Sequence, residues 1–135
     1  MTTISNTSTP LDSLYAAIER GDLEATMACF TDEATVWHSF DGIAQGRDAF
    51  RVGFRDLIDN LGERRVCDIR RQLLPDGLLQ QHVMVVTLPS GERKAWPVCI
   101  VVQVVGDKIV RIDEYIDRAG SFDPGAMVDV LMPGM

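Results

Sequence analysis

The sequence contains little of several residue types on which common functional sites depend. It has two histidines and three cysteines in 135 residues, and its 13 basic residues stand against 20 acidic ones, which gives a net charge of −7. Cys29, Cys67 and Cys99 are odd in number and far apart. This set fits neither a disulfide framework nor a zinc-ligand spacing, and it is typical of a reducing cytoplasm. With two histidines and no ligand spacing, we expect no catalytic metal and no cofactor.

Clustered positive charge and long apolar runs are also missing. Arg64-Arg65 and Arg70-Arg71 are isolated basic pairs, whereas a nucleic-acid surface needs a continuous positive footprint. No apolar run approaches the length of a membrane span, and residues 1–9 have neither the basic nor the apolar region of a signal peptide. We therefore expect a cytoplasmic protein without nucleic-acid or membrane partners, and a small apolar molecule as its ligand.

The first half of the sequence has helical periodicity. Apolar residues at i, i+3, i+4 and i+7 predict a helix that starts near Pro10 and stops at Gly21. Asp22 is a suitable N-cap for a short second helix. An apolar stripe predicts a third helix over residues 47–61, ended by Gly62.

The second half predicts an antiparallel meander of strands. Turn residues separate strands expected at 65–74, 78–88, 93–105 and 108–117, and another strand is expected at 32–40. Helices followed by a run of strands predict an α+β fold. We expect a strongly curved, mostly antiparallel sheet wrapped over three N-terminal helices, forming a cone with an internal cavity.

The length suits one domain with its own core. We predict that residues 10–118 form this domain and that residues 1–9 are a disordered leader. Residues 119–135 are rich in Gly and Pro around a few apolar residues. They are expected to form a tail, as a short helix, a flap over the pocket or part of a dimer contact.

The last strand carries the first candidate for chemistry. Side chains alternate between strand faces, so Val110, Ile112, Glu114 and Ile116 share one side. An acid among aliphatic residues is costly to bury unless a partner, a ligand or water meets it. The alternative is that twist or a bulge places Glu114 at a solvated edge.

Four short segments resemble the SnoaL-like and ketosteroid-isomerase-like proteins of the nuclear-transport-factor-type superfamily. They are Gly21-Asp22-Leu23-Glu24, Phe-Thr-Asp-Glu-Ala-Thr-Val-Trp-His at 30–38, Gly46-Arg47-Asp48-Ala49 and Gly-Asp-Lys-Ile-Val at 106–110. The resemblance spans residues 11–118 and implies a cone-shaped α+β fold. This superfold hosts isomerases, cyclases, dehydratases, epoxide hydrolases and non-enzymes, so the resemblance does not fix a reaction.

The resemblance also implies a homodimer formed through the outer face of the sheet. We expect that face to be apolar and therefore covered. The residues expected there are Trp96, Val98, Ile100 and Val102.

The positions that match a ketosteroid isomerase site are all changed. His38 stands where the resemblance implies a carboxylate base, and Cys99 where it implies a neutral carboxylic acid. Leu14, with Tyr15 one residue away, stands at the position of the oxyanion-hole tyrosine. Because leucine cannot donate a hydrogen bond, the steroid-isomerase mechanism is not expected.

Two other members of the superfamily offer partial matches. A limonene-epoxide-hydrolase-like site needs an acid before Tyr-x-Asp, which Glu114-Tyr115-Ile116-Asp117 supplies, but its Arg-x-Asp pair is missing around residues 80–83. SnoaL-like cyclases use a last-strand carboxylate as acid and base, which Glu114 or Asp113 matches. The SnoaL-like cyclases are the best fit.

The resemblance places His38, Cys99 and Glu114 around one cavity. Histidine titrates near neutral pH, and an apolar pocket raises the pKa of a carboxyl group. Our hypothesis is that His38 is a general base and that Glu114 orients it or serves as the acid. The alternative is that His38 bonds a backbone carbonyl at a strand end.

The expected pocket lining combines strand alternation, the third helix and the resemblance. If Gln81 and Val83 face the cavity, His82 faces away and has a structural role. Cys99 is expected as a small apolar wall residue rather than a nucleophile. The expected lining residues are Leu14, Tyr15, Phe50, Phe54, Gln81, Val83, Cys99 and Ile112.

The leading functional prediction is a cofactor-independent acid/base enzyme for a small apolar, cyclic molecule, of the cyclase, isomerase or dehydratase type. The alternatives are a non-catalytic binder of a small ligand, an epoxide-hydrolase-like enzyme, and a dimerisation module whose own side chains fill the cavity.

Overall fold

The first half of the chain forms the three expected helices. The computed structural model describes residues 8–125, and its helices are α1 (Pro10–Glu19), α2 (Leu23–Ala28) and α3 (Arg47–Asn60). The expected N-cap is confirmed, because the Asp22 side chain accepts from the backbone N–H of Ala25 at 2.9 Å.

The start of α1 corrects one expectation. Thr9, assigned to a disordered leader, is the N-cap of α1 and forms a reciprocal capping box with Asp12. Residues 1–7, the rest of the expected leader, lie outside the described residues.

Six strands form one open sheet in the order β2-β1-β6-β5-β4-β3. The strands are β1 (Phe30–His38), β2 (Ala44–Gln45), β3 (Arg64–Leu74), β4 (Gly77–Thr87), β5 (Arg93–Val105) and β6 (Lys108–Ile116). All neighbouring pairs are antiparallel except β1 and β6, which are parallel. The expected mostly antiparallel α+β fold is confirmed. The sequence did not indicate the two-residue strand β2.

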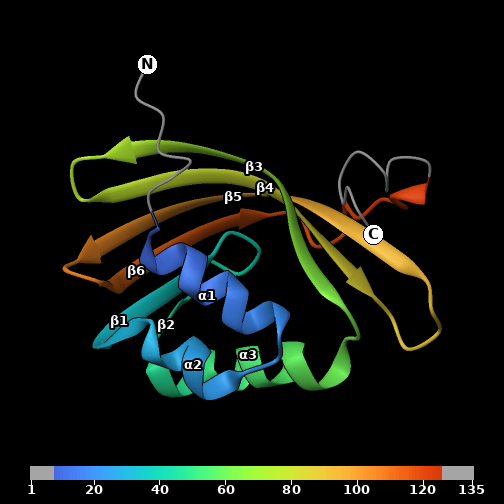
Figure 1. Cartoon of the computed structure of the whole chain (residues 1–135), viewed down its shortest axis with the longest axis horizontal. Coiled ribbons are helices and arrows are strands. Elements are labelled where there is room, and N and C mark those ends of the chain that lie inside the picture. Colours follow the sequence, from blue (N-terminus) through green and yellow to red (C-terminus); the bar gives the residue numbers. More distant parts are fainter. Residues whose placement is uncertain (1–7, 126–135) are drawn as a thin grey trace.

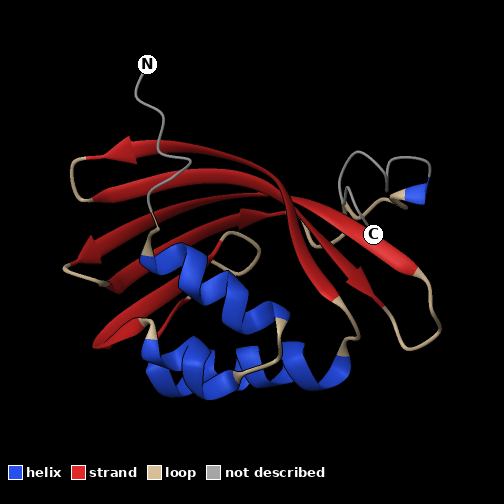
Figure 2. Cartoon of the chain, in the orientation of Figure 1, coloured by secondary structure: helices blue, strands red, loops and turns tan. Residues whose placement is uncertain are grey.

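The sheet curves over the helices. Figures 1 and 2 show all three helices on one side of the sheet, under its concave face. The close approach of β4 to β5 depends on Gly77, because a Cβ there would lie 1.8 Å from the Val102 carbonyl oxygen. Gly62, expected to end α3, is instead a place of close approach to Thr87, and α3 ends one residue earlier with Leu61 in extended conformation.

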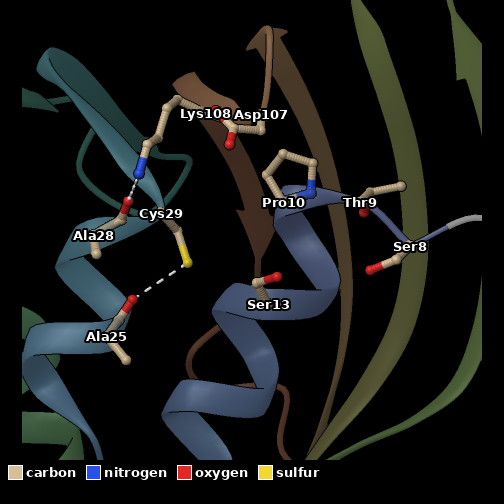
Figure 3. Close-up of a pocket in the computed structure, with 9 residues that line it drawn as sticks. All are labelled: Ser8, Thr9, Pro10, Ser13, Ala25, Ala28, Cys29, Asp107 and Lys108. Atoms are coloured by element: carbon tan, nitrogen blue, oxygen red, sulfur yellow. Dashed lines mark hydrogen bonds between the residues drawn. The ribbon is translucent and has the colours of Figure 1, made fainter.

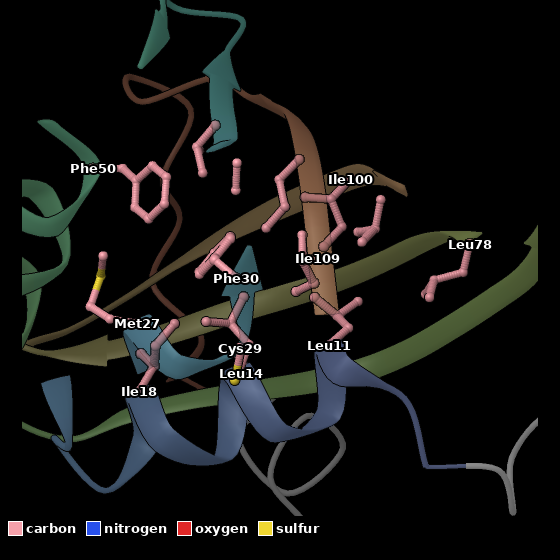
Figure 4. Close-up of a cluster of buried hydrophobic side chains, with 14 of the residues drawn as sticks. Leu11, Leu14, Ile18, Met27, Cys29, Phe30, Phe50, Leu78, Ile100 and Ile109 are labelled. Atoms are coloured by element: carbon pink, nitrogen blue, oxygen red, sulfur yellow. The ribbon is translucent and has the colours of Figure 1, made fainter. Parts of the chain in front are cut away.

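The main core lies between the concave face and the helices (Figure 4). Leu11 and Leu14 of α1 and Phe50 of α3 pack against apolar side chains of the sheet. The four β5 residues expected on the outer face belong to this core: Trp96, Val98, Ile100 and Val102. The expectation was wrong because β5 is apolar on both faces, so its hydrophobic pattern does not fix which face is buried.

A bulge changes the alternation at the start of β6. Val104 pairs with Ile109 while Gln103 pairs with Arg111, so Val110 has no partner of its own. Ile109 is buried in the main core, and Val110 does not share the face of Ile112 as expected. Beyond the bulge the expected alternation holds, and Glu114 stays on the face of Ile112.

The described part of the tail lies on the convex face of the sheet. The backbones of Phe122 and Ala95 exchange two hydrogen bonds of 2.9 Å. Phe122 packs against a second apolar cluster made by Cys67, Val83, Val85 and Ala95. Residues 119–125 therefore do not cover the concave side, and residues 126–135 lie outside the described chain.

Candidate active site

His38 and Glu114 lie side by side on the concave face. The His38 Nε2 atom is 3.5 Å from Glu114 Oε1. Their side chains are 22% and 25% exposed, so both are largely shielded from water while ligand access remains. The structure thus brings together the two residues that the sequence predicted as an acid/base pair.

The parallel pairing of β1 and β6 fixes this approach. His38 and Glu114 are register partners, so their side chains leave neighbouring strands toward the same face. Ser39 secures the strand ends: its N–H donates to the Glu114 carbonyl at 2.9 Å, and its hydroxyl exchanges hydrogen bonds with the backbone of Ile116. The pair is therefore positioned by backbone structure.

Burial shifts both groups toward their neutral forms. Loss of hydration raises the pKa of Glu114 to about 7. Burial also lowers the pKa of His38, against an opposing effect of Asp41 and assisted by the charge of Arg118. Near neutral pH, His38 is mainly neutral and Glu114 lies near its own midpoint. A pair in this state can take up or release a proton without a large change in pH.

The pair opens into a cavity of about 380 Å³ between β1, β6 and α3. Two of the expected lining residues, Phe50 and Phe54, form part of its wall. The complete lining is Val36, His38, Phe40, Gln45, Phe50, Gly53, Phe54, Leu57, Glu114 and Arg118. Apolar walls with a few polar groups are typical of small-molecule sites.

The rim of the cavity is a stack of three side chains. The Phe40 ring stacks on the His38 ring, with 4.8 Å between centroids and 27° between planes. The guanidinium carbon of Arg118 lies 4.6 Å from the centroid of the same Phe40 ring. Arg118 lies two residues after the end of β6 and four residues beyond Glu114.

Three expected lining residues surround the site without lining the cavity. Leu14 and Ile112 are buried in the main core. Tyr15 packs against the same core, and both burial and the charge of Glu114 raise the pKa of its hydroxyl. Tyr15 therefore lies near Glu114, on the α1 side.

Three other residues expected to line the cavity lie on the convex face of the sheet, away from it. Gln81 is exposed, Val83 belongs to the convex-face cluster, and Cys99 pairs with Gln81 across β4 and β5. His82, expected to face away, is on the concave face and is 1% exposed. The expectation failed because Gln80-Gln81-His82 offers polar side chains to both faces.

His82 is the buried end of a chain of polar contacts that begins at the partly exposed Asp12. Asp12 accepts two hydrogen bonds from the Arg71 guanidinium, whose Nε donates to Gln80 Oε1 at 2.6 Å. The Gln80 amide nitrogen therefore faces His82 Nδ1, at 3.0 Å. Because Nδ1 accepts this bond, the proton of the neutral ring is on Nε2.

The His82 ring is held neutral and its N–H is unused. Burial, with a smaller contribution from the charge of Arg71, lowers its pKa to about 4. The His82 Nε2 is buried and finds no acceptor within residues 8–125, and its ring meets that of Tyr15 edge-on at 5.1 Å. His82 is thus a fixed neutral donor beside Tyr15, a feature that the sequence did not predict.

Two signals in the sequence point to cavity residues that were missed. Gly53 lies inside α3, where glycine costs about 1 kcal/mol relative to alanine, and a Cβ there would meet nothing within 4 Å. A glycine inside a helical pattern indicates that space is needed there. Arg118 follows the candidate acid at a strand end, where loops carry functional groups. Gln45 and Phe40 had no such signal.

A second hollow lies where the start of α1 meets the end of α2 (Figure 3). Cys29 donates to the Ala25 carbonyl at 3.3 Å, and the Lys108 amino group donates to the Ala28 carbonyl. Burial raises the pKa of the Cys29 thiol. The Cys29 thiol and the Lys108 amino group are thus engaged in local contacts with backbone carbonyls.

Between residues 8 and 125, no three His, Cys, Asp or Glu side chains are grouped so that they could hold a metal ion. None of the helices there has both the length and the apolar character needed to cross a membrane.

Solved structures share this fold at low sequence identity. A proposed polyketide cyclase from Xanthomonas campestris pv. campestris is 20% identical, with a TM-score of 0.68 over 80% of this chain and 87% of that one. A protein with a ketosteroid isomerase-like fold from Catenulispora acidiphila is 16% identical, with a TM-score of 0.68 over 80% and 86%. An LEH-like epoxide hydrolase from M. tuberculosis is 18% identical, with a TM-score of 0.69 over 93% and 94%.

The sequence itself matches a family model. No curated protein matches the chain, but the model of the SnoaL-like domain matches residues 11–112. This match covers most of the sequence and agrees with the fold of the structural neighbours. The chain shares its fold with the ketosteroid isomerase-like structure, and by its sequence it belongs to the SnoaL-like domain family.

Proposed function

We propose that this protein is a cofactor-independent acid/base enzyme that moves a proton on a small, apolar, cyclic molecule. The observation that carries the proposal is the approach of His38 Nε2 to Glu114 Oε1, 3.5 Å apart in a cavity with apolar walls. The reaction class is enolisation, with isomerisation, dehydration or aldol-type cyclisation as its productive outcomes.

The second nitrogen of His38 is the atom that would receive the substrate proton. His38 Nδ1 is buried and has no hydrogen-bond partner in the described chain. When Glu114 is ionised, it draws the ring proton to Nε2 and leaves Nδ1 free as a base. When Glu114 is protonated, it donates to Nε2 and leaves the ring proton on Nδ1, which is then an acid.

One catalytic cycle follows from this exchange. Nδ1 takes a proton from a carbon beside the substrate carbonyl, which leaves an enolate and a His38 imidazolium. The Glu114 carboxylate stabilises the imidazolium through Nε2, as an acidic partner does for a catalytic histidine. The same proton is then returned to a different atom of the substrate, so no oxidant, metal or cofactor is consumed.

The cavity walls support this chemistry in two ways. Phe50, Phe54 and Leu57 offer an apolar surface that fits a ring-shaped substrate. They also keep water from the enolate and strengthen the interaction between Glu114 and His38.

Two alternatives are less well supported. An epoxide hydrolase of the limonene type needs two carboxylates around an arginine, whereas Glu114 is the one carboxylate that the described residues contribute to the cavity lining. A binder without turnover fits the apolar walls equally well, but it has no need for a buried histidine beside a carboxyl group of raised pKa.

Deuterium exchange tests the proposal without knowledge of the natural substrate. Proton NMR in D₂O would follow exchange at the α carbon of 2-tetralone, an enolisable cyclic ketone. We expect wild-type protein to accelerate exchange, and His38→Gln or Glu114→Gln to reduce the acceleration roughly 100-fold. The wild-type rate should rise with pH through about 7, where Glu114 ionises and frees Nδ1.

The matched control is Gln81→Ala, which changes a polar residue on the opposite face of β4. It should exchange deuterium at the wild-type rate. Full activity of His38→Gln would refute the assignment. Exchange no faster than in buffer, for 2-tetralone and a panel of other enolisable cyclic ketones, would favour the non-catalytic binder.

A further inference from the structure

The cavity has opposite charges at two different depths. Glu114 projects from within β6, whereas Arg118 lies beyond the end of that strand, at the rim. Within the described chain, Arg118 carries the only positive charge in the lining. A ligand that fills the cavity therefore meets a cation at the entrance and a carboxyl group further in.

Among residues 8–125, Arg118 has no carboxylate within 4 Å. Six arginines have a carboxylate within 4 Å: Arg20, Arg51, Arg65, Arg70, Arg71 and Arg111. Arg47 and Arg64 donate to backbone carbonyls. Within residues 8–125 the side chains of Arg55, Arg93 and Arg118 do neither, and of these three only Arg118 lines the cavity. The Arg118 guanidinium lies over the Phe40 ring instead.

The backbone holds Arg118 in this position. The Trp96 indole N–H donates to the Arg118 carbonyl at 3.1 Å. Asp117 stabilises the turn, because its side chain accepts from Ala119 at 3.0 Å and its carbonyl accepts from Gly120 at 2.9 Å. Arg118 is thus presented from a fixed turn, with its side chain supported by an aromatic ring.

We propose that the ligand of this cavity is a cyclic or aromatic carboxylic acid whose carboxylate binds Arg118. A planar guanidinium binds a planar carboxylate through two parallel hydrogen bonds. The acid group stays at the rim, because Glu114 would repel it further in, and the ring reaches Phe50 and Phe54. This orientation carries the ring carbons past His38, so the inference adds a substrate class to the proposed function and rests on it.

Binding of a matched pair of probes tests the inference. Calorimetry would compare 2-naphthoate with 2-naphthamide, which has nearly the same shape and no charge. We expect the wild-type protein to bind the acid at least about tenfold more tightly, since charge-assisted bidentate bonds are roughly twice as strong as neutral ones. Arg118→Gln should abolish this preference and leave the affinity for the amide unchanged.

The control variant is Arg93→Gln, which removes the same charge from the opposite face of β5, away from the cavity. It should retain the preference for the acid. His38 ring signals should shift on addition of 2-naphthoate, which places the probe in this cavity. Equal affinities for acid and amide, no binding of the acid, unchanged His38 signals, or an equal loss in Arg93→Gln would each overturn the inference.

The two proposals fail in different ways. If the acid preference depends on Arg118 but the deuterium exchange does not depend on His38, the protein binds cyclic acids without the proposed catalysis. If deuterium exchange on 2-tetralone depends on His38, but the wild-type protein does not bind 2-naphthoate more tightly than 2-naphthamide, the catalytic proposal stands and the substrate class is wrong.

Discussion

Glu114 is a carboxyl group whose ionisation opposes folding. Its pKa is 4.5 in an unfolded chain and about 7 in the folded protein. Between these values the folded state holds a proton that the unfolded state has released, so stability falls as pH rises through this window. A shift of this size corresponds to about 3 kcal/mol, fully expressed above pH 7.

Glu114→Gln should therefore stabilise the protein at high pH. Glutamine keeps the shape of the side chain and removes the buried charge. We expect urea unfolding to give a gain of about 1–3 kcal/mol at pH 8 and little change at about pH 3, where Glu114 is protonated in both states. Asp113→Asn, on the other face of β6, is the control. An equal gain at both pH values would show that burial of charge is not the cause.

Two candidate site residues could be singled out from the sequence for a definite physical reason. Glu114 stands out because its neighbours on the strand face are aliphatic, and His38 because of its position in a recognisable segment. The role of His82 was not predictable in this way. Its orientation depends on Arg71 and Asp12, which are 59 positions apart and meet only in the folded chain.

Among the elements, the ends of α1 and α3 and the start of β3 meet at one buried arginine. Arg64 is 7% exposed and has no carboxylate partner in the described chain. It donates to the carbonyls of Ile18, Ile58, Leu61 and Gly62 at 2.8–3.2 Å. These carbonyls lie near helix ends, where intrahelical donors are missing.

Replacing Arg64 should loosen this junction. Arg64→Lys keeps the charge but cannot reach four acceptors with one ammonium group, so buried carbonyls lose their partners. We expect a loss of about 2–4 kcal/mol in the free energy of unfolding, measured with urea.

The neighbouring residue supplies the control for that measurement. Arg65 faces the other side of β3 and forms an exposed pair with Glu63 at 3.6 Å. Arg65→Lys should change stability by less than about 0.5 kcal/mol. Similar losses in both variants would contradict the role assigned to Arg64.

Helices and turns were easier to predict than strand faces. Local signals such as Asp22 before α2 act within a few residues, and the structure agrees with them. Which face of β4 and β5 is buried depends on the elements that pack against the sheet. The sequence of these strands does not decide it, because both have apolar residues on each face. The bulge at Val110 also arises from pairing with β5, which no local pattern in β6 indicates.

For the whole molecule, the convex face of the sheet is the predicted dimer surface. Tyr115 is 49% exposed there, and its ring lies 5.3 Å from that of Trp37. Large exposed aromatic side chains are enriched at protein interfaces. Tyr115 and Trp37 therefore take the place of the β5 residues first expected at the dimer surface, because those β5 residues lie in the core.

We predict a homodimer in sedimentation velocity experiments. Tyr115→Arg should shift the protein to a monomer, because it places a charge in the centre of the proposed contact. Val52→Arg changes a residue that is 53% exposed on α3, on the helical side of the sheet, and should leave the dimer intact. A wild-type monomer at all concentrations tested, or a dimer that persists in Tyr115→Arg, would contradict this surface.

The parallel pairing of β1 with β6 has a consequence for biosynthesis. His38 leaves the ribosome 76 residues before Glu114, and its strand has no long neighbour until the last strand is made. Closing so long a loop is entropically slow compared with forming the hairpins between β3 and β6. The candidate active site is thus completed late, after the meander that supports it. A nascent chain interrupted before β6 would carry His38 without its partner and could not begin the proposed chemistry.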